Sequence, residues 1–128
     1  MDAFGEFAEL AAREGERADF VVVYIAEAHP TDGWLYPAVD YKIKQPIEIE
    51  ERLAAARILH TKKENIEGDV KIPLLVDSMT NSAALCFGAL PERRAIVVDG
   101  TVAWIGGDGP MNYSVQRCAK ALSALQGA

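Results

Sequence analysis

The sequence predicts a single α/β domain with a mixed sheet. Two short apolar runs rich in β-branched residues, 20–25 and 72–76, are typical of buried strands. Asp99-Gly100 stands between two further apolar runs and is a strong signal for a β-hairpin. Amphipathic segments alternate with these strands, which indicates helices packed on a sheet.

Length and composition set the class of protein. A chain of 128 residues fits one domain, residues 1–128. The net charge of -6 and the absence of a Lys/Arg cluster argue against a nucleic-acid partner. No apolar stretch is long enough for a membrane span, and the acidic N-terminus does not resemble a signal peptide. We therefore expect no membrane span and a cytoplasmic location.

The first third of the chain predicts a helix, a strand and a long loop. Residues 2–14 place apolar side chains on one helical face, and residues 20–25 form the first strand. A loop rich in proline follows over residues 26–46. Loops of this length are usually functional, so this one is the first place to look for a site.

The middle of the chain predicts a second helix over residues 48–60. An acidic first turn favours its start, and the inward face is expected to hold apolar residues that include Leu53 and Ala56. Residues 61–70 are polar and contain Gly68, which predicts a turn. The strand 72–76 then ends at Asp77.

The last third predicts two helices around the hairpin. Residues 81–89 form a short helix, with Ser78 or Thr80 as its N-cap and Gly88 near its end. The hairpin strands are 94–98 and 101–105. Ser114 caps a final helix, and the residues expected on its inward face are Val115, Cys118 or Ala119, Leu122 and Leu125.

Chemically capable side chains follow the first strand directly. Glu27 and His29 share a face if extended geometry continues beyond the strand, and Trp34 comes shortly after them. In open α/β sheets, ligands bind beyond the carboxyl ends of the strands. An imidazole with a near-neutral pKa is suited to donate a proton there. The alternative is that His29 closes the strand end and hydrogen-bonds Asp32.

Other candidate residues have both a functional and a structural interpretation. Arg93 stands before a hairpin strand, where its guanidinium could bind a carboxylate in bidentate fashion or pair with Glu92 or Asp77 on the surface. Tyr24 belongs either to the site or to the core. Trp34 lines an aromatic pocket or anchors its loop.

The cysteines and histidines give little support for a metal site. The chain has two of each, and none are grouped at ligand spacing, so no metal is expected. Cys86 and Cys118 lie far apart in helix-like segments. We expect both to be reduced thiols in or near the core.

Four blocks of sequence carry a resemblance to a known family. They are DFVVVYIAEAHPTDGW, EERLAAARIL, IPLLVDSMTNSAALCFGALPERRAIVVDG and WIGGDGPMNY. Together they resemble the catalytic domain of the iodothyronine deiodinases and their bacterial relatives, over nearly the whole chain. The resemblance implies a thioredoxin-like fold with peroxiredoxin-like details, here a mixed sheet of about four strands flanked by helices.

The same resemblance implies an activity. The family removes iodine reductively from a small iodinated aromatic with a selenocysteine or cysteine nucleophile, a thiol reductant as electron donor and no further cofactor. It places Glu27 and His29 in a proton relay that can include Tyr24, and it pairs Arg93 with His29 to hold the substrate. Pro46 stands where the animal enzymes tend to have a histidine, a departure that bears on which substrate is used.

The nucleophile itself is not matched. In the family, a strand precedes the first helix and the nucleophile lies between them, whereas this sequence starts at Met1 within that helix. Neither Cys86 nor Cys118 matches the nucleophile position. We expect a selenocysteine or cysteine to be encoded upstream, with a selenocysteine codon read as a stop, and the 128 residues alone to be inactive.

The strand that would precede the helix is central in the family's sheet. Without it, strands 20–25 and 94–98 must pair with each other, leave edges exposed or recruit a strand from a second molecule. This predicts a homodimer or a poorly behaved monomer. Two other functions stay open: a non-catalytic thioredoxin-like binding or dimerisation module, and a peroxiredoxin-like thiol reductase.

Overall fold

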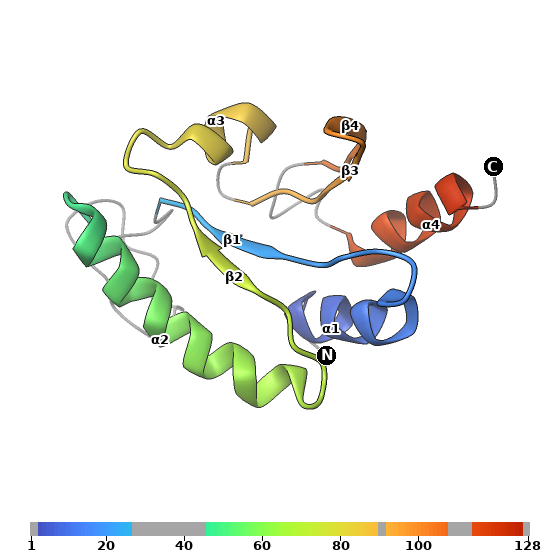
Figure 1. The fold of residues 1–128 in the computed structure, drawn as a ribbon, viewed down its shortest axis with the longest axis horizontal. Helices are drawn as coiled ribbons and strands as arrows, with labels where there is room; N and C mark the ends of the chain where they lie inside the picture. Colours follow the sequence, from blue (N-terminus) through green and yellow to red (C-terminus); the bar gives the residue numbers. More distant parts are fainter. Residues whose placement is uncertain (1–2, 27–45, 90–91, 108–113, 127–128) are drawn as a thin grey trace.

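The computed structural model describes residues 3–26, 46–89, 92–107 and 114–126, and it confirms the α/β class (Figure 1). The elements in chain order are α1 (Ala3–Glu14), β1 (Val22–Tyr24), α2 (Ile49–Glu67), β2 (Leu74–Val76), α3 (Ser82–Phe87), β3 (Ala95–Val98), β4 (Thr101–Ile105) and α4 (Val115–Gln126).

The strands form two small sheets and not the single mixed sheet that was predicted. β1 pairs in parallel with β2, with Val23 opposite Leu75. β3 pairs antiparallel with β4, with an irregularity between Ile96 and Val97. Among the described residues, β1 and β3 do not pair with each other, and no described strand links the two sheets. Of the three outcomes expected for these strands, the structure shows free edges.

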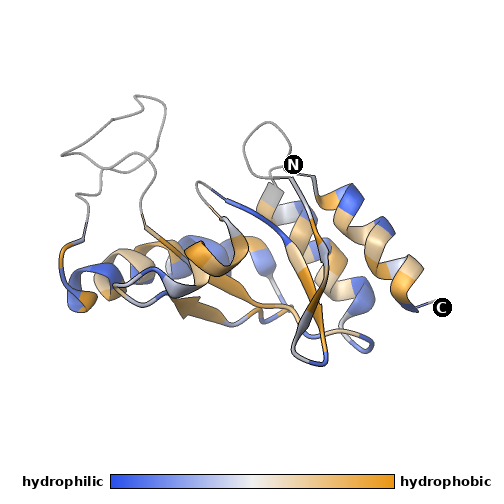
Figure 2. Ribbon diagram, turned by 90° about the horizontal axis from the view of Figure 1, so that it is seen from above, coloured by the Kyte–Doolittle hydropathy of each residue, from blue (hydrophilic) through white to orange (hydrophobic). Residues whose placement is uncertain are grey.

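One face of the β1–β2 pair is covered by α1 and α2 (Figure 1). Val22 packs toward a cluster of Ala8, Ala11 and Ile72, and Tyr24 packs on Ala55 and Ala56 of α2. The opposite face is open to solvent: Val21 is 48% exposed, Val23 38% and Leu75 53%. The strands are mainly hydrophobic in colour in Figure 2. An apolar sheet face without a covering layer usually marks a contact surface.

The second cluster joins the helices at the two ends of the chain. Leu10 of α1 packs with Val115 and Cys118 of α4, and Ile96 and Trp104 of the hairpin close this cluster. Because α1 and α4 share this core, the hairpin is held against the N-terminal helix by side chains and not by strand pairing. The predicted inward position of Leu125 is wrong, since this residue is 39% exposed.

Two local predictions about turns and caps are confirmed. Asp99 and Gly100 have φ values of 51° and 79°, the positive pair that a two-residue hairpin turn requires. The Ser114 hydroxyl accepts a hydrogen bond from the Arg117 amide at 3.2 Å and so caps α4. Both signals act over a few residues, which is why the sequence alone was sufficient.

The predicted turn at residues 61–70 is wrong, because α2 continues to Glu67. Lys63 and Glu67 extend the buried face of the helix, and their side chains are 3% and 1% exposed. The Lys63 Nζ and the Glu67 Oε2 lie 2.7 Å apart. The Glu67 carboxylate also accepts the Ile72 amide at 3.2 Å. Gly68, with φ of 63°, then ends the helix.

Burial acts to raise the pKa of Glu67, but the hydrogen bonds from Lys63 and the Ile72 amide, with the charge of Lys63, hold this pKa below its ordinary value. The carboxylate therefore stays ionised at neutral pH and depends on the ammonium group beside it. A buried pair of this kind is costly to break from one side, because the remaining charge has no partner.

We predict that Lys63→Met lowers the free energy of unfolding by about 3–5 kcal/mol, since it leaves the Glu67 carboxylate buried without its cation. The matched control is His60→Met, one turn earlier. His60 pairs with Glu64 at 3.1 Å, but both side chains are about half exposed. That control should cost at most about 1 kcal/mol. Urea unfolding measures both, and equal small losses would contradict the prediction.

Candidate functional site

The carboxyl ends of β1 and β2 meet at one point of the fold. The Asp77 amide, just after β2, donates a hydrogen bond to the Tyr24 carbonyl at the end of β1 at 2.8 Å. This is the edge at which parallel sheets usually bind ligands. Three of the predicted site residues, Glu27, His29 and Trp34, follow β1 in the sequence but lie outside the described residues.

Tyr24 is a core residue with an unused polar group. It is 7% exposed, and its ring packs on Ala55, Ala56 and Leu59 of α2. Its hydroxyl is buried and finds no hydrogen-bond partner in the part of the chain that the structure describes. Leaving a hydroxyl unsatisfied costs about 1–3 kcal/mol, so an ordinary core position would favour phenylalanine. The ring is therefore a core element, and the hydroxyl is a buried polar group with no hydrogen-bond partner among the described residues.

Arg52 is the site residue that sequence reasoning missed. It is 2% exposed and lies on α2, one turn before Ala55 and Ala56. Its Nη1 donates to the Ser78 carbonyl at 2.7 Å and to the Asp77 carbonyl at 3.3 Å, and its Nη2 donates to Asn81 Oδ1 at 3.0 Å. Its Nε is buried and has no hydrogen-bond partner among the described residues.

The predicted inward face of α2 is correct in part. Ala56 is buried as expected and Leu53 is half-buried, but the buried set also includes residues that were not expected there: Arg52, Ala55, Lys63 and Glu67. This set repeats at helical spacing, which is the signal that could have identified Arg52. It was hidden because an arginine and a lysine are rarely buried, so the apolar residues determined the prediction.

Asp77 connects the strand end to α3. It is 4% exposed, and its carboxylate accepts the amides of Ser78 at 2.8 Å, Ala83 at 2.9 Å and Ala84 at 3.0 Å. Burial alone raises its pKa, but these amides and the charge of Arg52 hold the pKa below its ordinary value. Asp77 therefore supplies the main cap of α3.

Ser78 or Thr80 is the predicted N-cap of α3, but neither residue is its main cap. Ser78 Oγ accepts the Ser82 amide at 3.3 Å, while Asn81 occupies the N-cap position in a left-handed conformation without a side-chain cap bond. The physical reason is reach: a buried carboxylate at the strand end satisfies amides that neither hydroxyl covers.

Arg93 joins two chain segments through their carbonyl groups. Its Nε donates to Gly106 at 2.7 Å beyond β4, and its Nη1 donates to Phe87 and Gly88 at the end of α3, at 3.3 Å each. A cation at a helix C-terminus is favourable there. Glu92 and Asp77 are both described, and neither forms an ion pair with Arg93, so that alternative is wrong.

The two cysteines differ in environment, and both are free. Cys118 is buried, and burial raises the pKa of its thiol while Arg94 acts to lower it. Cys86 is exposed on α3, which corrects the expectation that both thiols lie in or near the core. A buried thiol with a raised pKa is a poor nucleophile. Cys118 is therefore a core residue.

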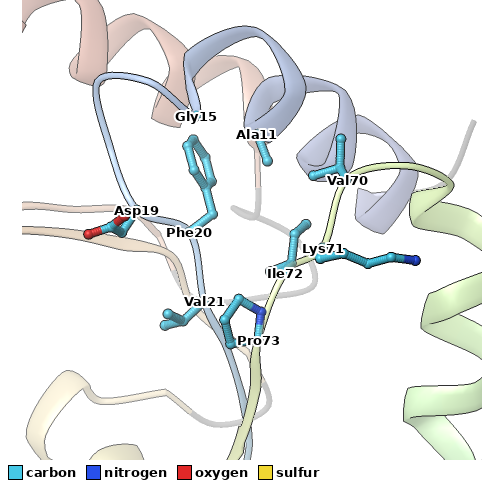
Figure 3. A pocket seen from close by; sticks show the side chains of 9 residues that line it. All are labelled: Ala11, Gly15, Asp19, Phe20, Val21, Val70, Lys71, Ile72 and Pro73. Carbon is cyan, nitrogen blue, oxygen red and sulfur yellow. The ribbon is translucent and has the colours of Figure 1, made fainter.

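A pocket of about 470 Å³ opens at the opposite end of the parallel strands (Figure 3). It lies where β1 and β2 begin, between the end of α1 and the chain entering each strand. Phe20, Ile72 and Pro73 give it an apolar lining, and Asp19 and Lys71 lie on opposite sides of it. Its position at the amino ends of the strands separates it from Tyr24 and Asp77.

Among the described residues, no three His, Cys, Asp or Glu side chains are grouped so that they could hold a metal ion. None of the helices described is both long and apolar enough to cross a membrane.

Comparison with known proteins identifies relatives over almost the whole chain. A family model described as iodothyronine deiodinase matches residues 1–126. Thyroxine 5-deiodinase of Ovis aries is 37% identical over 115 residues, which is 90% of this chain and 37% of the relative. The Homo sapiens protein is 36% identical, with 36% of its length covered, and the Gallus gallus protein 38% identical, with 42% covered. The chain thus spans about two fifths of the curated relatives it matches.

Asp77 gives a prediction about stability and pH. Asp77→Asn should lower the free energy of unfolding by about 1–3 kcal/mol at neutral pH, because part of the α3 cap is lost. A lowered folded-state pKa means that the carboxylate stabilises the protein above its unfolded-state pKa, and that this stabilisation is lost as pH falls through the folded-state value. The difference between wild type and variant should therefore shrink below about pH 4.

Urea unfolding at several pH values measures this difference. Asp69→Asn is the matched control, because Asp69 is exposed and follows the end of α2. A pH-independent gap between wild type and Asp77→Asn would contradict the assigned role.

Proposed function

The chain belongs to the iodothyronine deiodinase family, and on that premise we propose that it forms the catalytic part of a reductive dehalogenase acting on a small iodinated aromatic. The observation that carries the proposal is the family match over residues 1–126. We further propose a thioredoxin-like arrangement, in which β1 and β3 flank a central strand. The free edges of these two strands support it.

The proposed reaction exchanges iodine for a proton. A selenolate or thiolate takes the iodine from the ring carbon, the carbon–iodine bond breaks, and a proton is delivered to that carbon. Two thiols of the reductant then release iodide from the chalcogen, are oxidised to a disulfide and restore the nucleophile. In this proposal the attacking selenol or thiol lies outside these 128 residues, which is supported by the burial of Cys118 and the position of Cys86 on α3.

The proton path is assigned to Tyr24, Glu27 and His29. His29 delivers the proton, Glu27 orients the imidazole and returns a proton to it, and Tyr24 extends the relay. The support from geometry is the position of Tyr24 at the carboxyl end of β1, with its buried hydroxyl unused among the described residues. Glu27 follows Tyr24 by three positions in the sequence.

Substrate binding is assigned to Arg93 and Trp34. The guanidinium has five N–H donors, and the described bonds of Arg93 use its Nε and Nη1. Nη2 can therefore point to a substrate carboxylate while the other donors hold the arginine in place. Trp34 supplies an aromatic surface for the iodinated ring.

We expect His29→Gln to reduce kcat for iodide release by about 10²–10⁴-fold, because the proton donor is lost. The protein is expressed with its upstream chalcogen-bearing segment and assayed with an iodinated phenol and dithiothreitol. His60→Gln is the control, since His60 is exposed on α2 and pairs with Glu64.

Unchanged turnover in His29→Gln would remove His29 from the mechanism. Peroxide reduction without iodide release would favour the thiol reductase instead. Absence of both activities would favour a binding module.

We also propose that the chain forms a homodimer through its open sheet face. Exposed strand edges with apolar side chains favour association with another strand. Val21 and Val23 of the β1 region and Leu75 of β2 are 48%, 38% and 53% exposed. These residues give a partner chain an apolar surface beside unpaired backbone groups.

Sedimentation of the purified protein at micromolar concentration should show a dimer. Val23→Lys should shift it toward monomer, because a charge on the open face opposes association. Ile66→Lys is the control: Ile66 is also exposed, at 45%, but it lies on α2. A stable wild-type monomer, or equal effects of both variants, would contradict the proposal.

A further inference from the structure

The structure assigns a role to Arg52 that the family match does not give: it is a positioning residue for the proposed proton transfer. Its guanidinium fixes the carboxyl end of β2 and, through it, the end of β1 from which the chain continues to Glu27 and His29. This inference rests on the proposed function.

The first step is the fixing of β2. Arg52 donates from one nitrogen to two successive carbonyls, those of Asp77 and Ser78, and from another to Asn81 Oδ1. These acceptors lie on the chain between β2 and α3. Arg52 is 2% exposed, its bond to the Asp77 carbonyl is buried and the other two bonds are partly buried, so they hold the chain more firmly than surface bonds would.

The second step carries this constraint to β1. The Asp77 amide donates to the Tyr24 carbonyl at 2.8 Å, so the same residue that accepts from Arg52 also holds the last residue of β1. Tyr24 is further fixed by its ring against Ala55 and Ala56, one turn along α2 from Arg52. The main chain at Tyr24 therefore has a defined direction as it continues to Ala26.

The third step explains why arginine is needed. A planar guanidinium can donate to three acceptors that lie in different directions. A lysine ammonium is a point charge on a flexible stem and does not fix these three directions. The Asp77 carboxylate is occupied by three amides of the α3 cap, and the positive charge of Arg52 stands beside it. Arg52→Lys keeps the positive charge but loses the planar set of N–H donors, so it tests whether the guanidinium geometry is needed.

The kinetic test uses the protein with its upstream segment, an iodinated phenol and dithiothreitol. Arg52→Lys should lower kcat by about 10²-fold, because a small displacement of a catalytic group is enough for a loss of that size. KM should stay within about 2-fold, since the proposed positioning acts on the proton transfer and not on substrate binding. Arg57→Lys, on the exposed side of the same helix, is the matched control.

A folded Arg52→Lys variant with the kcat of the control would overturn the inference. A rise in KM at unchanged kcat would also overturn it, because that pattern indicates ground-state binding. If Arg52→Met does not fold, Arg52→Lys still decides, with circular dichroism confirming that the variant is folded.

Hydrogen exchange separates this inference from the proposed function. In Arg52→Lys the Asp77 amide should exchange about 10-fold faster or more, as expected for a locally loosened strand end. The Cys118 amide, which donates to the Ser114 carbonyl in α4, serves as the internal reference and should not change. If the wild-type protein releases no iodide, the proposed function is rejected and the positioning role is not. If the Asp77 amide of Arg52→Lys exchanges as slowly as in wild type, the positioning role is rejected.

Discussion

The buried guanidinium of Arg52 is the interaction on which this end of the fold depends. It links α2 to the segment between β2 and α3, and the Asp77 amide extends the link to β1. Without it, the carbonyls of Asp77 and Ser78 would lose their Arg52 donor, and the cap of α3 would lose the positive charge beside it. A charged side chain in the core is tolerated here because most of its donors are satisfied.

Predictions that depended on a few neighbouring residues succeeded. Asp99-Gly100 requires positive φ values, and Ser114 reaches an amide three residues later, so both features follow from local chemistry. The end of α2 was not predictable in this way. Its last turns are polar in sequence, and they are helical because Lys63 and Glu67 neutralise each other inside the fold, a contact that exists only after packing.

The residues of the candidate site also divide into those predicted from neighbouring sequence and those whose contacts exist only in the folded chain. The carboxylate and imidazole after β1 stay predictions that rest on residue type and on the position of a strand end. Helical spacing could have indicated that Arg52 is buried, but its acceptors could not be predicted because they lie on a segment more than twenty residues away in the sequence. The single four-stranded sheet was expected from the family resemblance, but pairing of strands is a property of the assembled chain. β1 and β3 keep free edges among the described residues.

The two thiols differ so much in access that they are chemically distinguishable. Cys86 is exposed on α3 and Cys118 is buried between α4 and α1. In the native state a maleimide dye will therefore attach to Cys86 alone, without any mutation. That position follows the Asp77 cap and precedes the carbonyls that Arg93 holds. A single fluorophore on α3 thus gives an optical reporter beside the segment that Arg52, Asp77 and Arg93 hold together.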